Sequence, residues 1–505
     1  MNYKSSNIRT LMKVWVIFLA GVMAGCNSWL DLQPNNDRTT ASYWQSKEEV
    51  ENVLMSCYVK MRNCLEKYVQ WGELRGDGLA LGTGATTNDE KVKRLDILYD
   101  NPICKWNTFY EVIGCANSVI KYGPQVLERD ATFSKELEAA YSAEAVVLRS
   151  LAYFWLVRTF GEVPLVTEPY VDDEEPFFTP KTTERKILDQ IITDLKEAIP
   201  HCKPGYSSTP SNNWEDKGRA TRWAAYAILA DIYLWDEKYQ ECVDACDQII
   251  ASGKYDLLDE ENWINLFAEG NTMEGIFELQ WKGSANQENN LYSWFYSDAE
   301  KPRFVASDKT VDLYIRYAEM DLRYLGATVV DKDDKRIWKY VGTGIKGLGG
   351  TVRPSGQRDA NWIFYRYADV LLMRAEALVM LGEEDFATAY KVVGDLRARA
   401  GYTVALPKPQ GQKEALEMLL DERQREFVAE GKRWFDLLRF ARRNNWQYKE
   451  DLVEILLDGV SAKDRPVWKA KLSDVNSYYL PIHKDEIEAN AGVLEQNPYY
   501  QDIEF

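Results

Sequence analysis

Histidine is almost absent from the chain. The 505 residues include two, His201 and His483, which lie far apart in the sequence. A histidine-based zinc site or a catalytic triad would need one of them, and neither lies in a supporting motif. Catalysis by a histidine-dependent nucleophile is therefore not expected, and neither is a metal or other cofactor.

Positive charge is also in short supply. Lys and Arg number 61 against 79 Asp and Glu, which gives a net charge of −18. A chain this acidic repels phosphate backbones, and no basic stripe reverses the charge locally. Nucleic acid is therefore not an expected partner.

Long apolar runs and cysteine motifs are missing as well. Beyond residue 25, no stretch approaches the about 18 apolar residues that a membrane-spanning helix needs. The eight cysteines include no CxxC pair, and an odd number follows Cys26. Cys242 and Cys246 are spaced as small packing residues on one helix face. We expect no further membrane span and no disulfide framework.

The N-terminal segment has the features of a lipoprotein signal peptide. Basic residues precede an apolar run over residues 14–23, which is the length of a signal-peptide core. The run ends in Met-Ala-Gly-Cys, similar to a lipobox, with Cys26 as the lipidation site. We expect removal of residues 1–25 and a lipid-anchored tether over 26–46. Each buried methylene contributes about 0.8 kcal/mol, so several palmitate-like chains anchor the protein to a membrane lastingly.

Helical periodicity dominates the rest of the chain. Two segments are typical of tetratricopeptide helix pairs. In the first, Tyr226 and Tyr233 line one helix face, and Cys242 and Cys246 supply the small side chains of the next helix. The second segment, residues 367–401, repeats the pattern. Stacked pairs of this kind build a scaffold, so the predicted fold class is mostly α, with a few short strands.

This pattern predicts one domain over residues 47–505. Its loop-rich parts should face a ligand, because binding residues concentrate in loops on a rigid scaffold. The helical scaffold is expected mainly at residues 47–66, 133–250 and 364–445, and the ligand-facing parts mainly at 70–105 and 270–360.

Ordered sequence blocks along nearly the whole chain resemble the SusD/RagB family of outer-membrane lipoproteins. The most specific block is ERQREFVAEGKRWFDLLRF at residues 422–440. Its charged residues suit ion pairs between helices, and its Phe427, Trp434 and Leu437 suit the core. The other blocks are the lipobox and residues 29–35, 149–166, 219–235, 366–382, 396–401, 478–490 and 496–500.

The resemblance implies a function. Such proteins are non-catalytic, sit at the cell surface on a lipid anchor in the outer membrane, and bind oligosaccharides. It also implies a partner, a SusC-like TonB-dependent transporter that receives the glycan.

Loop aromatics are the expected sugar platforms, because sugars present apolar C–H faces beside rings of hydroxyls. Aromatic residues make up 13% of the chain, which leaves some for a binding surface. Trp71 and Trp294 are the foremost candidates. The full set of candidate ligand-binding residues is Trp71, Asp77 and Asn88 from the first loop region, and Trp281, Trp294, Tyr296 and Arg303 from the second.

Three alternatives stay open from the sequence. A peptide-capturing member of the same family would favour backbone-pairing groups over aromatic platforms. An all-helical glycoside hydrolase would need two carboxylates about 5 to 10 Å apart across a cleft. A plain assembly scaffold would leave the lipobox and the late sequence blocks unexplained.

Overall fold

The structure is a computed structural model that describes residues 43–170, 178–207, 214–315, 321–382, 384–402, 404–490 and 492–501. The chain divides into two units, residues 1–45 and 46–505, and the second contains all the elements below. Cys26 and the expected signal peptide lie outside the described residues.

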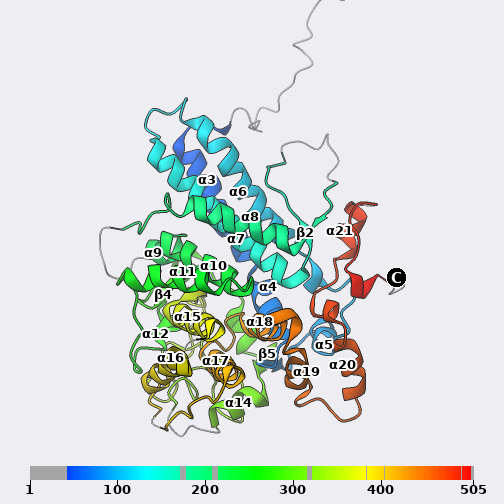
Figure 1. Cartoon of the computed structure of the whole chain (residues 1–505). Helices are drawn as coiled ribbons and strands as arrows, with labels where there is room; N and C mark the ends of the chain where they lie inside the picture. Colours follow the sequence, from blue (N-terminus) through cyan, green and yellow to red (C-terminus); the bar gives the residue numbers. More distant parts are fainter. Residues whose placement is uncertain are drawn as a thin grey trace, which may run out of the picture. The chain divides into compact units, whose positions relative to one another are not determined.

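Helices account for most of the second unit (Figure 1). The longer ones are α3 (Lys47–Asn63), α6 (Asn107–Val126), α7 (Lys135–Phe160), α8 (Glu184–Ala198), α10 (Arg222–Trp235), α11 (Tyr239–Ala251), α15 (Tyr367–Leu381), α16 (Ala387–Arg399), α17 (Gln412–Glu426) and α18 (Arg433–Trp446). The shorter ones are α4 (Leu65–Val69), α5 (Thr87–Lys93), α9 (Trp214–Gly218), α12 (Asn265–Ala268), α13 (Leu291–Phe295), α14 (Asp308–Ile315), α19 (Lys449–Leu457), α20 (Arg465–Leu472) and α21 (Lys484–Ala489), with single turns η2 (Gln70–Leu74), η3 (Pro102–Cys104), η4 (Gly283–Ala285), η5 (Glu384–Phe386), η6 (Val475–Tyr478) and η7 (Pro498–Tyr500).

Helix α7 illustrates how local sequence sets the helix ends. The Ser134 side chain accepts a hydrogen bond from the backbone N–H of Leu137, which caps the first turn. The helix stops at Gly161, whose φ of 75° is a conformation that glycine adopts without steric cost. Between these ends the helix is buried on nearly all sides, so it forms the centre of the first helical layer.

Successive helices pack side by side as the tetratricopeptide pattern predicts. Helices α3, α6, α7 and α8 form one run of neighbours, and α10, α11, α15 and α16 form another (Figure 1). Cys242 and Cys246 on α11 and Ala389 on α16 are fully buried. Their small side chains let neighbouring helices approach closely, which confirms the role expected for them.

Three short antiparallel pairs complete the fold. Strand β4 (Gly275–Leu279) pairs with β6 (Trp362–Arg366), and β2 (Val163–Pro164) pairs with β3 (Lys181–Thr182). Strand β1 (Leu79–Leu81) pairs with β5 (Phe304–Ala306). The β1–β5 pair joins the two loop-rich regions that the sequence predicted separately. Residues 72–89 are therefore less loop-like than expected, because they include β1 and parts of η2 and α5.

Buried ion pairs hold the later helices together. Arg366 at the start of α15 is fully buried and contacts the carboxylates of Glu274, Glu426 and Glu430 at 2.7, 2.5 and 3.0 Å. Arg323 pairs with Glu426 from another side. The ion pairs expected for the block at residues 422–440 are confirmed, and Phe427, Trp434 and Leu437 of that block are buried.

Membrane-spanning length is a separate question from membrane anchoring. Within the described ranges, the structure contains no helix with both the length and the apolar character needed to cross a bilayer.

Candidate functional site

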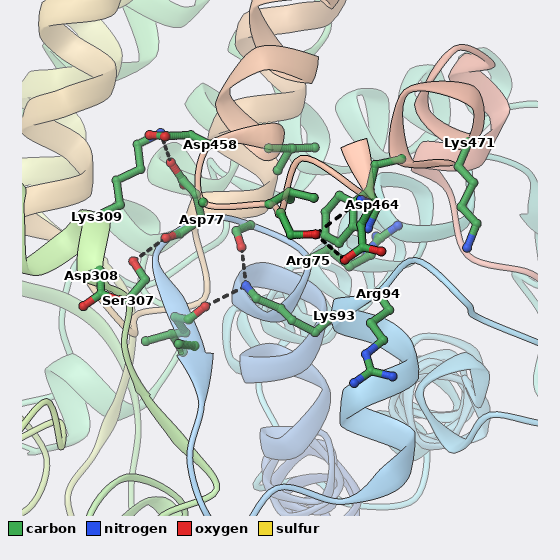
Figure 2. A pocket seen from close by; sticks show the side chains of 18 of the residues that line it. Arg75, Asp77, Lys93, Arg94, Ser307, Asp308, Lys309, Asp458, Asp464 and Lys471 are labelled. Carbon is green, nitrogen blue, oxygen red and sulfur yellow. Dashed lines mark hydrogen bonds and ion pairs between the residues drawn. The ribbon is translucent and has the colours of Figure 1, made fainter. Parts of the chain in front are cut away.

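Two of the hollows that adjoin the loop-rich regions contain residues predicted for the site. The larger of these two, here called the charged cleft, has a volume of about 960 Å³ and is lined by residues of β1, α5, α14, α19 and α20 and of the segments beside them. Figure 2 shows its side chains, most of which carry charge. They include Arg75, Asp77, Lys93, Arg94, Asp96, Asp308, Lys309, Asp312, Asp458, Asp464, Trp468 and Lys471.

The charges of this cleft largely satisfy one another. Asp77 accepts from Arg433 at 2.6 Å and contacts Lys309 at 2.9 Å. Burial alone would raise the pKa of Asp77, but the two cations outweigh it and hold that pKa below its ordinary value. The Lys93 ammonium donates to backbone carbonyls of Gly76 and Leu79, each at 2.7 Å (Figure 2). Asp77 is therefore committed to ion pairs, and a ligand would have to compete with them.

The smaller hollow, here called the tryptophan pocket, has a volume of about 410 Å³. Trp281 and Trp294 both line it, although 12 residues separate them in the sequence, and Trp294 lies on the short helix α13. Helices α3 and α4 also contribute to its lining. The remaining lining residues are Val59, Arg62, Asn63, Leu65, Glu66, Gln287, Glu288, Asn289 and Asn290.

The two indoles are half-buried, which leaves part of each ring open to the pocket. The backbone N–H of Trp281 donates to the side chain of Asn361 at 3.3 Å. The backbone carbonyl of Trp294 accepts from the N–H of Arg303 at 2.8 Å. Both rings are thus carried by anchored backbone, which is what a rigid sugar platform requires.

Hydrogen bonds attach the polar wall of the pocket to the neighbouring loop, residues 356–360. Asn289 donates from its side chain to the carbonyl of Ala360 at 2.8 Å. One oxygen of Glu288 accepts from the backbone N–H groups of Gly356 and Arg358 at 2.7 and 3.0 Å. Loop residues that would otherwise move are therefore pre-positioned beside the tryptophans.

Arg303 supports the pocket from behind. Its guanidinium binds both oxygens of Asp89 at 2.7 and 2.8 Å and one oxygen of Glu66 at 2.7 Å. Burial lowers the pKa of Arg303, but the hydrogen bonds that the guanidinium donates to the two carboxylates outweigh that effect and raise it. Because Glu66 lines the pocket, Arg303 fixes a wall residue and ties α4 to the second loop region.

Comparison with known proteins identifies the family. The SusD family model matches residues 263–500, and a second model, described as starch-binding and associating with the outer membrane, matches residues 28–234. The chain belongs to the SusD/RagB family. A SusD-like protein of Formosa agariphila is 24% identical, over 90% of this chain and 94% of its own length.

Solved structures share the fold. A SusD superfamily protein from Bacteroides thetaiotaomicron superposes with a TM-score of 0.71 at 22% identity, and the match covers 90% of this chain and 99% of that one. A laminarin-binding SusD-like protein gives a TM-score of 0.69 at 22% identity, with the same coverage of both chains. The mostly helical, tetratricopeptide-like fold is thus confirmed, and the family is a glycan-binding one associated with the outer membrane.

Trp71, one of the two foremost candidates for ligand binding, does not lie at the surface. Trp71 is 0% exposed, and its indole N–H donates to the carbonyl of Ile103 at 2.8 Å. Its ring stacks on Phe109. Trp71 was expected to contact the ligand, and this expectation was wrong. The glycine-rich sequence after Trp71 suggested a loop, but Trp71 lies in η2, which directly follows α4 and is buried.

The other candidates fall into separate places. Asn88 lies outside the tryptophan pocket, where its backbone carbonyl accepts from the side chain of Asn101 at 3.3 Å. Tyr296 also lies outside it, and the Arg336 guanidinium covers one face of its ring at 4.1 Å. The structure therefore brings Trp281 and Trp294 together, places Arg303 behind them, and puts Asp77 in the charged cleft.

Arg62 and Glu66 were not anticipated as site residues. Helical periodicity assigned both to the polar side of the first scaffold helix, and that pattern says only that a residue avoids the core. Both line the pocket together with the two indoles. A basic residue one turn from an acidic one on a polar face was the available signal, and it is too common to single out a site.

Proposed function

We propose that this SusD-like protein is a non-catalytic glycan-binding lipoprotein that captures an oligosaccharide in the tryptophan pocket. The supporting observation is the convergence of Trp281 and Trp294 on one concave, partly polar pocket. Indole faces stack on the apolar C–H faces of sugars, while amides such as Asn290 bond the hydroxyls. The laminarin-binding relative supports a glycan as the ligand class.

The charged cleft is a weaker candidate despite its greater volume. Its ion pairs, such as Asp77 with Arg433, would have to be broken or bridged before they could bind a sugar. Its lining includes a single tryptophan, Trp468, whereas the tryptophan pocket has two. Affinity for a sugar depends on fitted aromatic and polar groups more than on open volume.

Membrane attachment and delivery form the second half of the proposal. Lipidation of Cys26 would anchor the chain in the outer membrane facing the cell surface, where a SusC-like TonB-dependent transporter receives the glycan. The support is the lipobox-like sequence and the family's outer-membrane association. Mass spectrometry of the membrane fraction tests acylation, with Cys26→Ala as the soluble control. Co-purification with a barrel transporter tests the partnership, and its absence from membranes that contain the lipoprotein would contradict it.

Hydrolysis is the alternative with a specific motive, because Glu66 and Glu288 both line the pocket. Glu66 is tied to Arg303, and Glu288 accepts two backbone N–H groups. Both carboxylates thus hold the pocket wall, which favours binding over turnover. Incubation with the bound glycan followed by product analysis decides: cleavage that Glu66→Gln or Glu288→Gln abolishes would establish the hydrolase.

Calorimetric titration of the soluble protein from Asn27 onward tests the binding proposal, against a panel of plant, host and microbial glycans and mixed peptides. We expect saturable glycan binding that Trp281→Ala and Trp294→Ala each weaken by at least about tenfold. Trp468→Ala, which removes a tryptophan from the charged cleft, is the matched control and should bind normally. Loss of binding in that control alone would move the site to the cleft, and binding of peptides alone would identify a peptide-capturing member.

A further inference from the structure

Arg62 is the one feature of the tryptophan pocket that a neutral sugar does not explain. Its guanidinium lies over the Trp281 ring, with its central carbon 5.7 Å from the ring centroid. Its Nε is buried and has no hydrogen-bond partner. Within the described ranges, no ion pair joins Arg62 to a carboxylate, whereas Arg303 nearby is paired twice.

The acidic residues of the pocket do not compensate this charge. Glu66 directs its carboxylate to Arg303 at 2.7 Å. Glu288 uses one oxygen to accept from two backbone N–H groups of the neighbouring loop. Arg62 therefore presents an uncompensated cation to the pocket. Burial also lowers the pKa of Arg62, because it removes part of the water around the charged guanidinium.

An unpaired, partly desolvated guanidinium costs free energy unless something binds it. Arginine has five N–H donors in a planar fork that matches a carboxylate with two parallel hydrogen bonds. The fork here lies above an indole that can hold a sugar ring by its apolar face. A sugar whose ring stacks on Trp281 could carry a carboxylate within reach of the Arg62 fork.

Building on the proposed function, we infer that the glycan taken by this pocket is acidic, and that Arg62 recognises the carboxylate of a uronic acid unit beside Trp281. The preference resides in one side chain, whereas sugar binding as such resides in the two indoles and the amides. The two can therefore be separated by substitution.

The test compares each acidic glycan with its own carboxyl-reduced form, which differs only in the group that Arg62 would bind. Oligogalacturonide, mannuronate oligosaccharide and glucuronate-bearing xylo-oligosaccharide serve as probes, with a sulfated galactan oligosaccharide as the competing anion. We expect one acidic probe to bind about 10- to 100-fold more tightly than its reduced form. Arg62→Gln should erase that difference by weakening the binding of the acidic form far more than that of the reduced form.

Lys60→Gln is the matched control, because Lys60 lies on the same helix, carries the same charge and pairs with Glu111 outside the pocket. It should keep the preference. Equal binding of acidic and reduced forms by the native protein would overturn the inference and leave the glycan-binding proposal standing, as would a preference only for the sulfated probe. Absence of binding to every glycan by the folded protein would overturn both.

Discussion

The ring of Trp71 stacks on the ring of Phe109 with the two centroids 4.6 Å apart and the planes 18° from parallel. This contact connects η2 to α6 in the interior. Trp71 also donates its indole N–H to a backbone carbonyl, so the residue is satisfied in its polar as well as its apolar contacts. Its role is to hold the first loop region against the helical scaffold.

Replacing Trp71 with alanine should therefore destabilise the fold rather than abolish ligand contact. A fully buried tryptophan exchanged for alanine costs about 3–5 kcal/mol of unfolding free energy. Trp71→Phe keeps the stack on Phe109 and should cost less. Chemical denaturation measures both, and glycan affinity of the folded fraction should equal that of the native protein. A stable Trp71→Ala variant that no longer binds would contradict this assignment.

The scaffold was predictable from the sequence because helical periodicity reports burial directly. The expected scaffold range 47–66 contains α3 and the start of α4, and the range 133–250 contains α7, α8, α10 and most of α11. The charged block at residues 422–440 was expected to make ion pairs, and Glu422 and Glu426 do so with arginines from other segments. Charged residues that alternate with core residues in the sequence become buried, and a buried charge is tolerated only when it is paired. The sequence pattern therefore implied that these residues have oppositely charged partners.

The pocket was only half predictable, because it joins segments distant in the sequence. Trp281 and Trp294 were expected from loop aromatics, but Arg62 and Glu66 come from α3 and α4, more than 200 residues earlier. Their juxtaposition depends on the β1–β5 pairing and on the Arg303 ion pairs. No local propensity encodes such long-range contacts. Trp71 shows the converse case, in which a loop-like neighbourhood concealed a core position.

Arg303 should matter for both stability and binding. The Asp89 side chain is 1% exposed, and Arg303→Met would leave its carboxylate buried without its main cation. Breaking a buried pair from one side typically costs about 3–5 kcal/mol. Glu66 would also lose the contact that holds it in the pocket wall, so glycan affinity should fall. The double variant Arg303→Met/Asp89→Asn should recover part of the stability, since the unpaired charge is gone.

Thermal unfolding and calorimetry on the same three proteins separate the two effects. Recovery of stability without recovery of affinity in the double variant would identify Arg303 as a positioning residue for Glu66. If Arg303→Met unfolds at the same temperature as the native protein, the ion pairs of Arg303 with Asp89 and Glu66 do not stabilise the fold.

The ion pairs around Arg366 should contribute far more to the free energy of unfolding than ion pairs at the surface do. Arg366 and its partners Glu274, Glu426 and Glu430 are all fully buried. Arg366→Met would remove one cation from three buried carboxylates, which keep Arg399, Arg323 and Lys339 as partners, and should cost about 3–5 kcal/mol. The exposed pair of Lys391 with Asp395 is the comparison, because Lys391→Ala should cost about 0.5 kcal/mol or less. Denaturant midpoints measure both, and similar losses in the two variants would refute the ranking.

Glu73 gives the fold a pH dependence of its own. The side chain is completely buried in η2, and one oxygen accepts from the backbone N–H groups of Gly431 and Lys432 at 2.8 and 3.1 Å. Burial raises the pKa of Glu73 from an ordinary value of about 4.5 to about 8, against the opposing effect of those two hydrogen bonds. Between these two values the folded chain retains a proton that the unfolded chain releases.

Because the folded state binds the extra proton, stability must fall as pH rises from about 5 to about 8. Glu73→Gln keeps an oxygen acceptor for Gly431 and Lys432 but does not titrate, so it removes this contribution alone. The melting temperature of the native protein minus that of the variant should decline steadily across this pH range. Carboxylates whose pKa is lowered in the fold, such as Glu376, change stability mainly at pH values below this range. They are present in both proteins, so their contribution cancels when the two melting temperatures are subtracted. A difference in melting temperature that stays the same at every pH would mean that Glu73 is ionised in the folded protein, with a cation or water offsetting its burial.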